Sequence, residues 1–379
     1  MPSIGQIIGL AEALRTPAVA ICAKHCTHRH HQASTCSRCV QVCPTHAISV
    51  SADGPQLDAL GCIDCGACAS VCPTGALEPL KPTDPALLQM IATSAACTNR
   101  VTIACAQVSS LGSDIVTLHC LARLDRSLLL FAFARGAVSV RLCAGACDDC
   151  VKGHLVAQVS SVVADARRVL ELFAVPGRID FGEALEIPES EATPPVGLTR
   201  RGLFEILRKG GRDYAAKAVT VFLPEPGAKQ EKSRRENPGQ VPLKRELLLA
   251  SLRALVPEGS APPGARSPFM APQLDRTRCN GCAMCGRICP SGALGIEEDG
   301  DGGLLRITCQ EGTCVECGLC VEMCERKALS LAPVPTERIL VRDLSTRMLI
   351  ERRQHEAEPL YVSLEDKMNK LLGVAVHRI

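Results

Sequence analysis

Four runs of closely spaced cysteines could each bind iron. Residues 62–73 and 279–290 both read Cys-x2-Cys-x2-Cys-x3-Cys-Pro, residues 314–324 lack only the proline, and residues 36–44 hold the last three cysteines and the proline. This spacing is typical of [4Fe-4S] sites, in which three thiolates on a tight loop bind one cluster and the fourth cysteine binds its neighbour. The spacing therefore predicts two pairs of clusters, with ligands exchanged within each pair.

The exchange of fourth ligands predicts four ligand sets. In the C-terminal pair they are Cys279, Cys282, Cys285 with Cys324, and Cys314, Cys317, Cys320 with Cys289. In the N-terminal pair they are Cys62, Cys65, Cys68 with Cys43, and Cys36, Cys39, Cys72 with a displaced first ligand. Ala33 occupies the usual place of that ligand, so Cys26 or Cys22 must reach in across residues 27–35. We favour Cys26 because its loop is shorter, and a three-iron cluster is the alternative if neither reaches.

Other chemistry is possible at some of these residues. Paired Cys-x2-Cys motifs also suit zinc, but zinc ribbons use two pairs rather than a triplet with a distant fourth cysteine. Glu325 replaces the proline after Cys324, which we expect to alter the local backbone more than the ligation. The surplus Cys309 is interpreted as a buried, inert thiol. Four histidines in or beside the 27–35 insertion lack regular ligand spacing, which favours a solvated polar loop over a metal site: His25, His28, His30 and His31.

Composition limits the remaining possibilities. The 379 residues allow two or three domains. A net charge of +2 and the scarcity of aromatic residues give no reason to expect nucleic-acid binding. The first 20 residues have no long apolar run, so we expect a reducing cytoplasm, where the 24 cysteines would act as metal ligands. No stretch of about 18 apolar residues occurs, and we therefore expect no membrane span.

The first and last cysteine-rich regions are internal copies of one design. In each, a short β-hairpin joins two cysteine runs, with turn residues at 53–55 and 299–303. Both regions resemble the bacterial-type 2[4Fe-4S] ferredoxins, or polyferredoxins. The resemblance implies four [4Fe-4S] clusters, each held between short helices and paired strands.

The middle region has a different pattern. Short β-rich runs at 101–104, 115–118 and 137–142 alternate with helical runs at 124–135 and 151–173. This alternation predicts a small parallel α/β domain. Cys105, Cys120 and Cys143 each follow or end a predicted strand, so we expect them to converge at the carboxyl edge of the sheet.

Residues 95–170 also resemble the delta subunit of methyl-viologen-reducing hydrogenase. The matching residues are Cys120, Arg123, Asp125, Phe133, Gly136, Ala137 and Cys143. The family's later Gly-Asp-Cys-His pattern is replaced by Asp148-Asp149-Cys150-Val151, with Cys147 additional. The resemblance implies a [2Fe-2S] cluster on Cys105, Cys120, Cys143 and one of Cys147 or Cys150. A set of buried structural thiols is the alternative.

The expected architecture is α+β, with two ferredoxin-like modules flanking a small parallel α/β domain. We expect boundaries at 1–82 (first module), 83–175 (α/β domain), 176–270 (linker), 271–335 (second module) and 336–379 (tail). The linker is rich in Pro and Gly but should hold helices at 200–218 and 243–256, which are candidates for docking a partner.

The expected function is electron transfer. No hydrolytic triad, P-loop or dinucleotide fingerprint is present, so we expect no substrate chemistry of the chain's own. We expect electrons to pass between the two modules through the cysteines of the middle domain. Redox protein partners would act as electron donor and acceptor. The resemblance implies a hydrogenase, formate dehydrogenase or heterodisulfide-reductase-like partner. The alternative is an enzyme that reduces a disulfide or sulfur species at the central cysteines.

Overall fold

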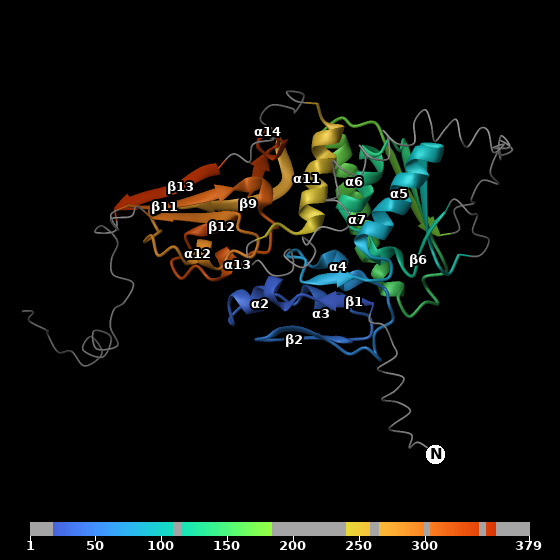
Figure 1. Ribbon diagram of the computed structural model, residues 1–379, viewed down its shortest axis with the longest axis horizontal. Coiled ribbons are helices and arrows are strands. Elements are labelled where there is room, and N and C mark those ends of the chain that lie inside the picture. Colours follow the sequence, from blue (N-terminus) through green and yellow to red (C-terminus); the bar gives the residue numbers. More distant parts are fainter. Residues whose placement is uncertain are drawn as a thin grey trace, which may run out of the picture.

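A computed structural model describes residues 18–108, 115–183, 240–257, 265–298, 304–340 and 346–353. Its elements form three parts, which are two cysteine-rich modules and a middle domain built on a parallel sheet (Figure 1). In this view the N-terminal module, in blue, lies beneath both other parts. The architecture is therefore mixed α and β, as predicted. The helix predicted at 200–218 lies outside the described residues.

The two cysteine-rich modules repeat one order of elements. Each begins and ends with strands that pair antiparallel, and between them a hairpin separates two short helices. The N-terminal order is β1 (Val19–Ile21), α3 (Arg38–Val42), β2 (Ile48–Ser51), β3 (Gly54–Leu57), α4 (Ala67–Val71) and β4 (Leu77–Pro79). The C-terminal order is β9 (Arg266–Leu274), α12 (Met284–Arg287), β10 (Leu294–Glu298), β11 (Leu304–Gln310), α13 (Leu319–Glu322) and β12 (Leu329–Pro335). The internal duplication seen in the sequence is thus present in the fold.

Each module also has elements that the other lacks. In the N-terminal module, η1 (Ala23–His25) and α2 (Thr27–His30) occupy the insertion before the first cysteine run. In the C-terminal module, η4 (Glu311–Thr313) and α14 (Thr336–Leu340) are added, and β13 (Thr346–Arg353) pairs with β11. Residues 336–340 and 346–353, predicted as part of a tail, therefore extend the C-terminal module.

The middle domain is built on a four-stranded parallel sheet of order β6-β5-β7-β8. Its elements are α5 (Asp84–Thr98), β5 (Arg100–Cys105), β6 (Val116–Leu118), η2 (Leu121–Arg123), α6 (Arg126–Ala134), β7 (Ser139–Ala144), η3 (Gly153–Leu155), α7 (Val156–Leu172) and β8 (Arg178–Glu183). The strands and helices expected in this region are present, and α5 and β8 are additional. Strand β8 lies in the segment that the sequence assigned to the linker.

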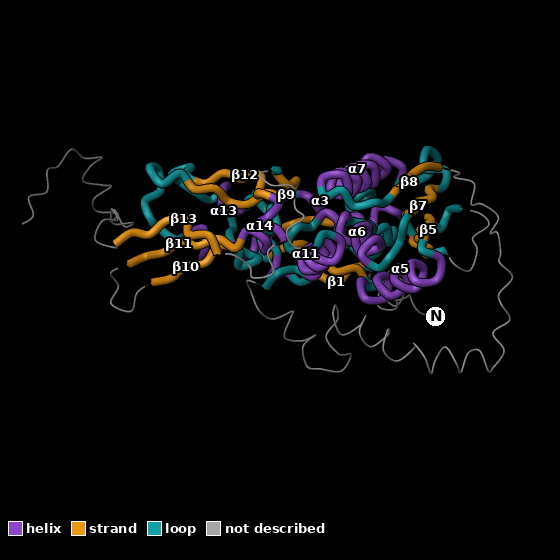
Figure 2. The backbone as a smooth tube through the Cα atoms, turned by 90° about the horizontal axis from the view of Figure 1, so that it is seen from above, coloured by secondary structure: helices purple, strands orange, loops and turns teal. Residues whose placement is uncertain are grey.

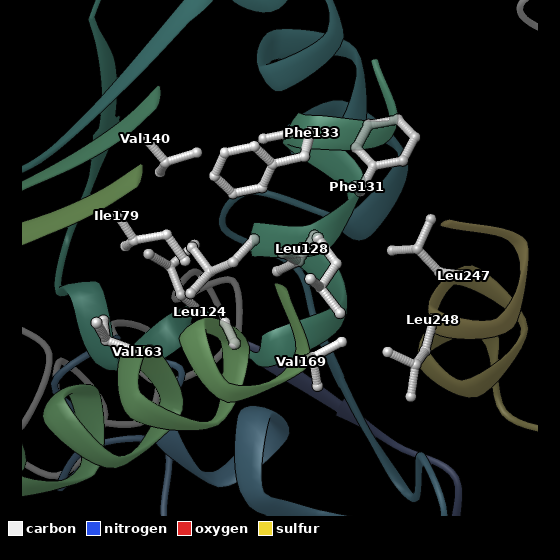
Figure 3. Close-up of a cluster of buried hydrophobic side chains, with 14 of the residues drawn as sticks. Leu124, Leu128, Phe131, Phe133, Val140, Val163, Val169, Ile179, Leu247 and Leu248 are labelled. Carbon is white, nitrogen blue, oxygen red and sulfur yellow. The ribbon is translucent and has the colours of Figure 1, made fainter. Parts of the chain in front are cut away.

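Helix α6 is the centre of the middle domain. Asp125 caps it by accepting hydrogen bonds from the backbone N–H groups of Ser127 and Leu128. All residues from Ser127 to Phe133 are buried, as expected of a helix that is covered on every side. Figure 3 shows Leu247 and Leu248 of α11 (Leu243–Leu255) facing the α6 side chains Leu128 and Phe131.

Helix α11 belongs to this core rather than to an external docking surface. Its Leu247, Leu248 and Leu252 are buried in a hydrophobic cluster that continues into the C-terminal module at Phe269 and Ile339. Figures 1 and 2 both show α11 between the middle domain and the C-terminal module. The helix predicted at 243–256 is therefore present, but its apolar face is covered by this same chain.

Truncating Leu252 should be costly, because its side chain is fully buried in the shared core. We expect Leu252→Ala to lower the free energy of unfolding of this core by about 2–5 kcal/mol through lost burial and the cavity left behind. The matched change Met90→Ala on α5, where the side chain is exposed, should cost less than about 0.5 kcal/mol. Hydrogen exchange of α6 amides measures both. Equal protection in the two variants would contradict the assignment of α11 to the core.

Candidate iron–sulfur sites

Left-handed backbone shapes three of the cysteine runs in the same way. The residues just before and just after the second cysteine both have positive φ in each of them: Asp64 and Gly66, Gly281 and Ala283, Glu316 and Gly318. Two such residues, one on each side of the second cysteine, curl the chain, so that neighbouring cysteines of a run can face one point. Around Cys36 the pattern is absent, since Ser37 has φ −124°. The run that lacks its first cysteine thus also lacks this curl.

A second shared feature follows the last cysteine of all four runs. The third residue after that cysteine has positive φ, and the residue that follows it is a buried alanine. The four pairs are His46 and Ala47, Gly75 and Ala76, Gly292 and Ala293, and Lys327 and Ala328. The run ending at Cys324 keeps this course although Glu325 replaces proline. The expected change in the backbone at this position is therefore not seen in these features.

The N-terminal cysteines lie in two neighbouring sets, and Cys26 lies beside the cysteines of the first. Burial raises the pKa of Cys39 to about 11, with further increases from the nearby Cys72, Cys36 and Cys26. Burial also raises the pKa of Cys26, and Cys72 and Cys36 add to it. We call this set group 1: Cys26, Cys36, Cys39 and Cys72. Cys26 is buried whereas Cys22 is only half-buried, and the choice of Cys26 as ligand stays a prediction.

Group 2 holds the other N-terminal set, Cys43, Cys62, Cys65 and Cys68. Burial raises the pKa of Cys68 to about 12, and the charges of Cys65, Cys62 and Cys43 raise it further. Thr45 and Thr74 lie two residues beyond Cys43 and Cys72, with hydroxyl oxygens 3.8 and 3.6 Å from the respective Sγ atoms. Polar groups this close to sulfur are among the factors that set the reduction potential of a cluster.

The C-terminal cysteines gather in the same crossed manner. Group 3 is Cys279, Cys282, Cys285 and Cys324, and group 4 is Cys289, Cys314, Cys317 and Cys320. Burial raises the pKa of Cys285 to about 12. The nearby Cys282, Cys279 and, from the distant run, Cys324 raise it further. Burial also raises the pKa of Cys314 to about 12, and Cys317 and Cys289 add to it. The two groups lie side by side, because Cys285 also contributes to the raised pKa of Cys320.

These donor sets fit iron–sulfur clusters. Each is a group of four thiols, several of them buried and crowded, and both effects oppose ionisation of the free thiol. Bound iron would supply the positive charge that stabilises four adjacent thiolates. Backbone N–H groups already point at sulfur, with Gly281 N 3.4 Å from Cys279 Sγ and Ala328 N 3.3 Å from Cys324 Sγ.

In the middle domain three of the predicted cysteines lie together. The pKa of Cys120 is raised by burial, and Cys105 and Cys147 both add to it. We call Cys105, Cys120 and Cys147 the middle thiols. Cys150 follows in the same turn, where its N–H donates to the carbonyl of Cys147. No group of three or more His, Cys, Asp or Glu in the described parts of the chain is placed to hold a single metal ion.

Cys143 does not join the middle thiols. It is the register partner of Ala104, so these two side chains point to the same face of the sheet. Cys105 is the next residue on β5 and therefore points to the opposite face. Cys105 and Cys143 both reach the carboxyl edge of the sheet, as predicted, but on opposite faces, so the expected ligand set that includes Cys143 is not brought together.

The middle thiols adjoin group 2. Cys120 is the neighbouring thiol that adds most to the pKa of Cys65, which burial raises to about 11. Close by, a Cβ on Gly66 would lie 2.7 Å from Cδ of Arg123, so glycine is needed both for this contact and for its positive φ. Arg123 is buried and forms an ion pair with Asp84. This packing fixes the first module against the middle domain.

Groups 1 and 4 also adjoin, across the interface of the two ferredoxin-like modules. Arg38, between Cys36 and Cys39, donates to the carbonyl of Glu316, which lies between Cys314 and Cys317, at 3.2 Å. The N–H of Thr35 donates to the Glu322 carboxylate at 2.8 Å. The modules thus meet directly, not only through the middle domain as expected. Sequence reasoning missed Arg38 and Glu316, although both stand inside the cysteine runs.

The remaining candidates have smaller roles. Cys309 is fully buried, and burial raises its pKa to about 12, as expected of an inert thiol. The histidine-rich insertion is more ordered than the predicted polar loop, because it holds α2 and His28 Nε2 lies 2.8 Å from the Cys36 carbonyl. Burial lowers the pKa of His30, and the neighbouring His25 lowers it further.

Comparison with known protein families agrees with this geometry. Residues 34–76 and 278–336 match the 4Fe-4S dicluster domain. Both ends of the chain are iron–sulfur cluster-binding, electron-transfer domains. Two such domains indicate four [4Fe-4S] clusters, and the match leaves the middle region unassigned. Searches of curated proteins and of solved structures gave no match. None of the described helices is long and apolar enough to cross a membrane.

Proposed function

We propose that the chain is an electron-transfer protein that holds four [4Fe-4S] clusters in one continuous row. The observation that carries this proposal is the succession of neighbouring ligand groups in the fold. A bound [4Fe-4S] cluster supplies reversible one-electron transfer, and the protein sets its potential through hydrogen bonds, charge and burial.

The proposed row runs from the middle thiols through groups 2, 1 and 4 to group 3. Cys65 and Cys120 join the middle thiols to group 2. Helix α3 joins groups 2 and 1, because it contains Cys39 of group 1 and Cys43 of group 2 is its C-cap residue. Arg38 and Glu316 join groups 1 and 4, and Cys285 and Cys320 join groups 4 and 3. The row therefore has two ends, the middle thiols and group 3.

We further propose a [2Fe-2S] cluster on the middle thiols with Cys150 as the fourth ligand. Three neighbouring thiols and a fourth in the same turn support this choice, and it excludes Cys143. A redox partner would act at each end of the row, as donor or acceptor. The resemblance of residues 95–170 favours a hydrogenase, formate dehydrogenase or heterodisulfide-reductase-like partner, in the cytoplasm.

Anaerobic reconstitution, iron and sulfide counts and an EPR redox titration test this proposal. We expect about sixteen irons from four [4Fe-4S] clusters and about two more in the middle domain. Cys120→Ser should remove the additional iron, whereas Cys143→Ser should retain it. Loss of that iron in both variants, or in neither, would contradict the middle site. Fewer than about fifteen irons in the wild type would contradict the row of four clusters.

A further inference from the structure

A cavity of about 580 Å³ lies where all three parts of the protein meet. Val42 and Val71 contribute to it from the N-terminal module, Val162 and Leu248 from α7 and α11, and Glu316 from the C-terminal module. Small-molecule sites have volumes of roughly 300–1,000 Å³ and occur preferentially at domain interfaces. This cavity has the size and the place of such a site.

A buried cation, Arg245, lines the cavity and has hydrogen-bonding capacity left over. Only 4% of the residue is exposed. Its Nε donates to the carbonyl of Gly312 at 2.7 Å, and Nη1 lies 3.4 Å from Glu316 Oε1. Its Nη2 has no hydrogen-bond partner among the described residues. Burial lowers the pKa of Arg245 to about 10, so the side chain remains positively charged at neutral pH. A buried, charged N–H donor without an acceptor is unfavourable unless a ligand supplies one.

A second guanidinium, on Arg126, shares the same counterion. Its Nη2 lies 3.1 Å from the Oε1 atom of Glu316 that Arg245 also approaches. Both guanidinium groups lie over the buried ring of Phe269, at 4.7 and 5.3 Å from its centroid. The ring attracts both guanidinium groups and limits their movement, as in other cation–π pairs. One carboxylate between two fixed guanidinium groups leaves net positive charge at the cavity wall.

The N-terminus of α11 adds to this positive potential. The helix has 13 residues, and its first turn places Lys244 and Arg245 in the cavity lining. Pro242 at its N-cap has no side-chain hydrogen bond to the helix. The N–H groups of Arg245 and Glu246 donate to the Pro242 carbonyl, so the N-terminus contributes mainly the positive end of the helix dipole, which favours anions.

The other two acids of the lining have partners of their own. Asp125 accepts the backbone N–H groups that begin α6, and Asp165 pairs with Arg168 on the exposed side of α7. Apolar side chains, among them Val42, Val71 and Leu248, make up much of the remaining wall. The cavity therefore offers a cationic end and an apolar body.

We propose that this cavity binds a small organic anion with a carboxylate or phosphate head and an apolar body. The head would accept hydrogen bonds from Arg245 and Arg126 at the N-terminus of α11, and the body would lie along the valine and leucine side chains. The cavity also lies beside groups 1 and 4, since it is lined by Arg38, Val71, Pro73 and Glu316, which neighbour Cys39, Cys72 and Cys317. Resting on the proposed electron-transfer function, the anion's charge would disfavour reduction at these two groups and so regulate the row.

Titration calorimetry on the reconstituted full-length protein tests the binding. The probes are phenyl phosphate, benzoate and the neutral analogue benzyl alcohol. We expect one phenyl phosphate or benzoate per chain, bound more weakly as salt increases, and no saturable binding of benzyl alcohol. Absence of saturable binding of both anions at millimolar concentration would overturn the proposal.

Variants that make the lining more negative or more positive should change anion affinity in opposite directions. A folding defect would lower the affinity in every variant. Arg126→Gln and Gln158→Glu should each weaken phenyl phosphate binding about tenfold, and Asp165→Asn should strengthen it. Gln89→Glu on the exposed side of α5 is the control and should leave binding unchanged. Equal affinity in all four variants would overturn the site. Iron counts and the calorimetry do not require electron transfer, so failure of the proposed function and failure of this site are distinguishable.

Discussion

Replacing Cys26 by serine in the reconstituted protein is expected to change one cluster and leave three intact. Cys26 is the buried neighbour of Cys36, Cys39 and Cys72, and its run offers no other cysteine at the usual first position. Without it, group 1 retains three thiols, which is the ligand number of a three-iron cluster. We therefore expect loss of between one and four irons per chain, with an oxidised three-iron EPR signal if the cluster survives.

Cys22→Ser is the matched control for this prediction. Cys22 is the N-cap residue of η1, only four positions before Cys26, and it is half-buried whereas Cys26 is buried. The control should keep the wild-type iron count and the wild-type EPR titration. A normal iron count in Cys26→Ser together with a reduced count in Cys22→Ser would show that the insertion folds differently and that Cys22 is the ligand.

Features set by residues close together in the sequence could be predicted, whereas features set by contacts between distant residues could not. Ligand sets followed from spacing, because a loop of three closely spaced cysteines has few conformations and the fourth cysteine lies in the paired run. Cys143 was misplaced because strand alternation reverses with a shift of one residue, and the sequence does not give the register of β5 against β7. Strand β13 was missed for a related reason, since its charged residues Arg347, Glu351, Arg352 and Arg353 are those of an edge strand and not of a core.

Contacts between the modules were beyond prediction for another physical reason. Arg38 and Glu316 are 278 residues apart, and each looks like an ordinary surface residue within a cysteine run. The packing of α11 against both α6 and the C-terminal module helps to bring the two cysteine-rich modules together. The row of ligand groups is therefore a property of the assembled chain.

Removing iron is expected to unfold the N-terminal module while leaving the parallel sheet intact. The small core of that module includes Cys26, Cys68 and Cys72 among its buried members. Its larger buried apolar side chains are Val19, Ile48 and Leu77, and Val40, Val42 and Leu57 pack against them partly buried. Such a core buries too little apolar surface to order the chain by itself, so cluster binding must supply much of its folding free energy. The middle domain has a far larger core around α6, and most of its buried members are aliphatic or aromatic side chains.

Hydrogen exchange followed by mass spectrometry, before and after anaerobic chelation of iron, measures this difference. Amides of β2 and β3 should lose protection at least about a hundredfold, equivalent to about 3 kcal/mol, whereas those of β5 and β7 should change less than about threefold. Adding iron and sulfide back should restore the protection of the hairpin, which excludes irreversible damage as the cause. Unchanged protection of β2 and β3 without iron would contradict the idea that cluster ligation folds the module, because its few buried aliphatic side chains would then suffice.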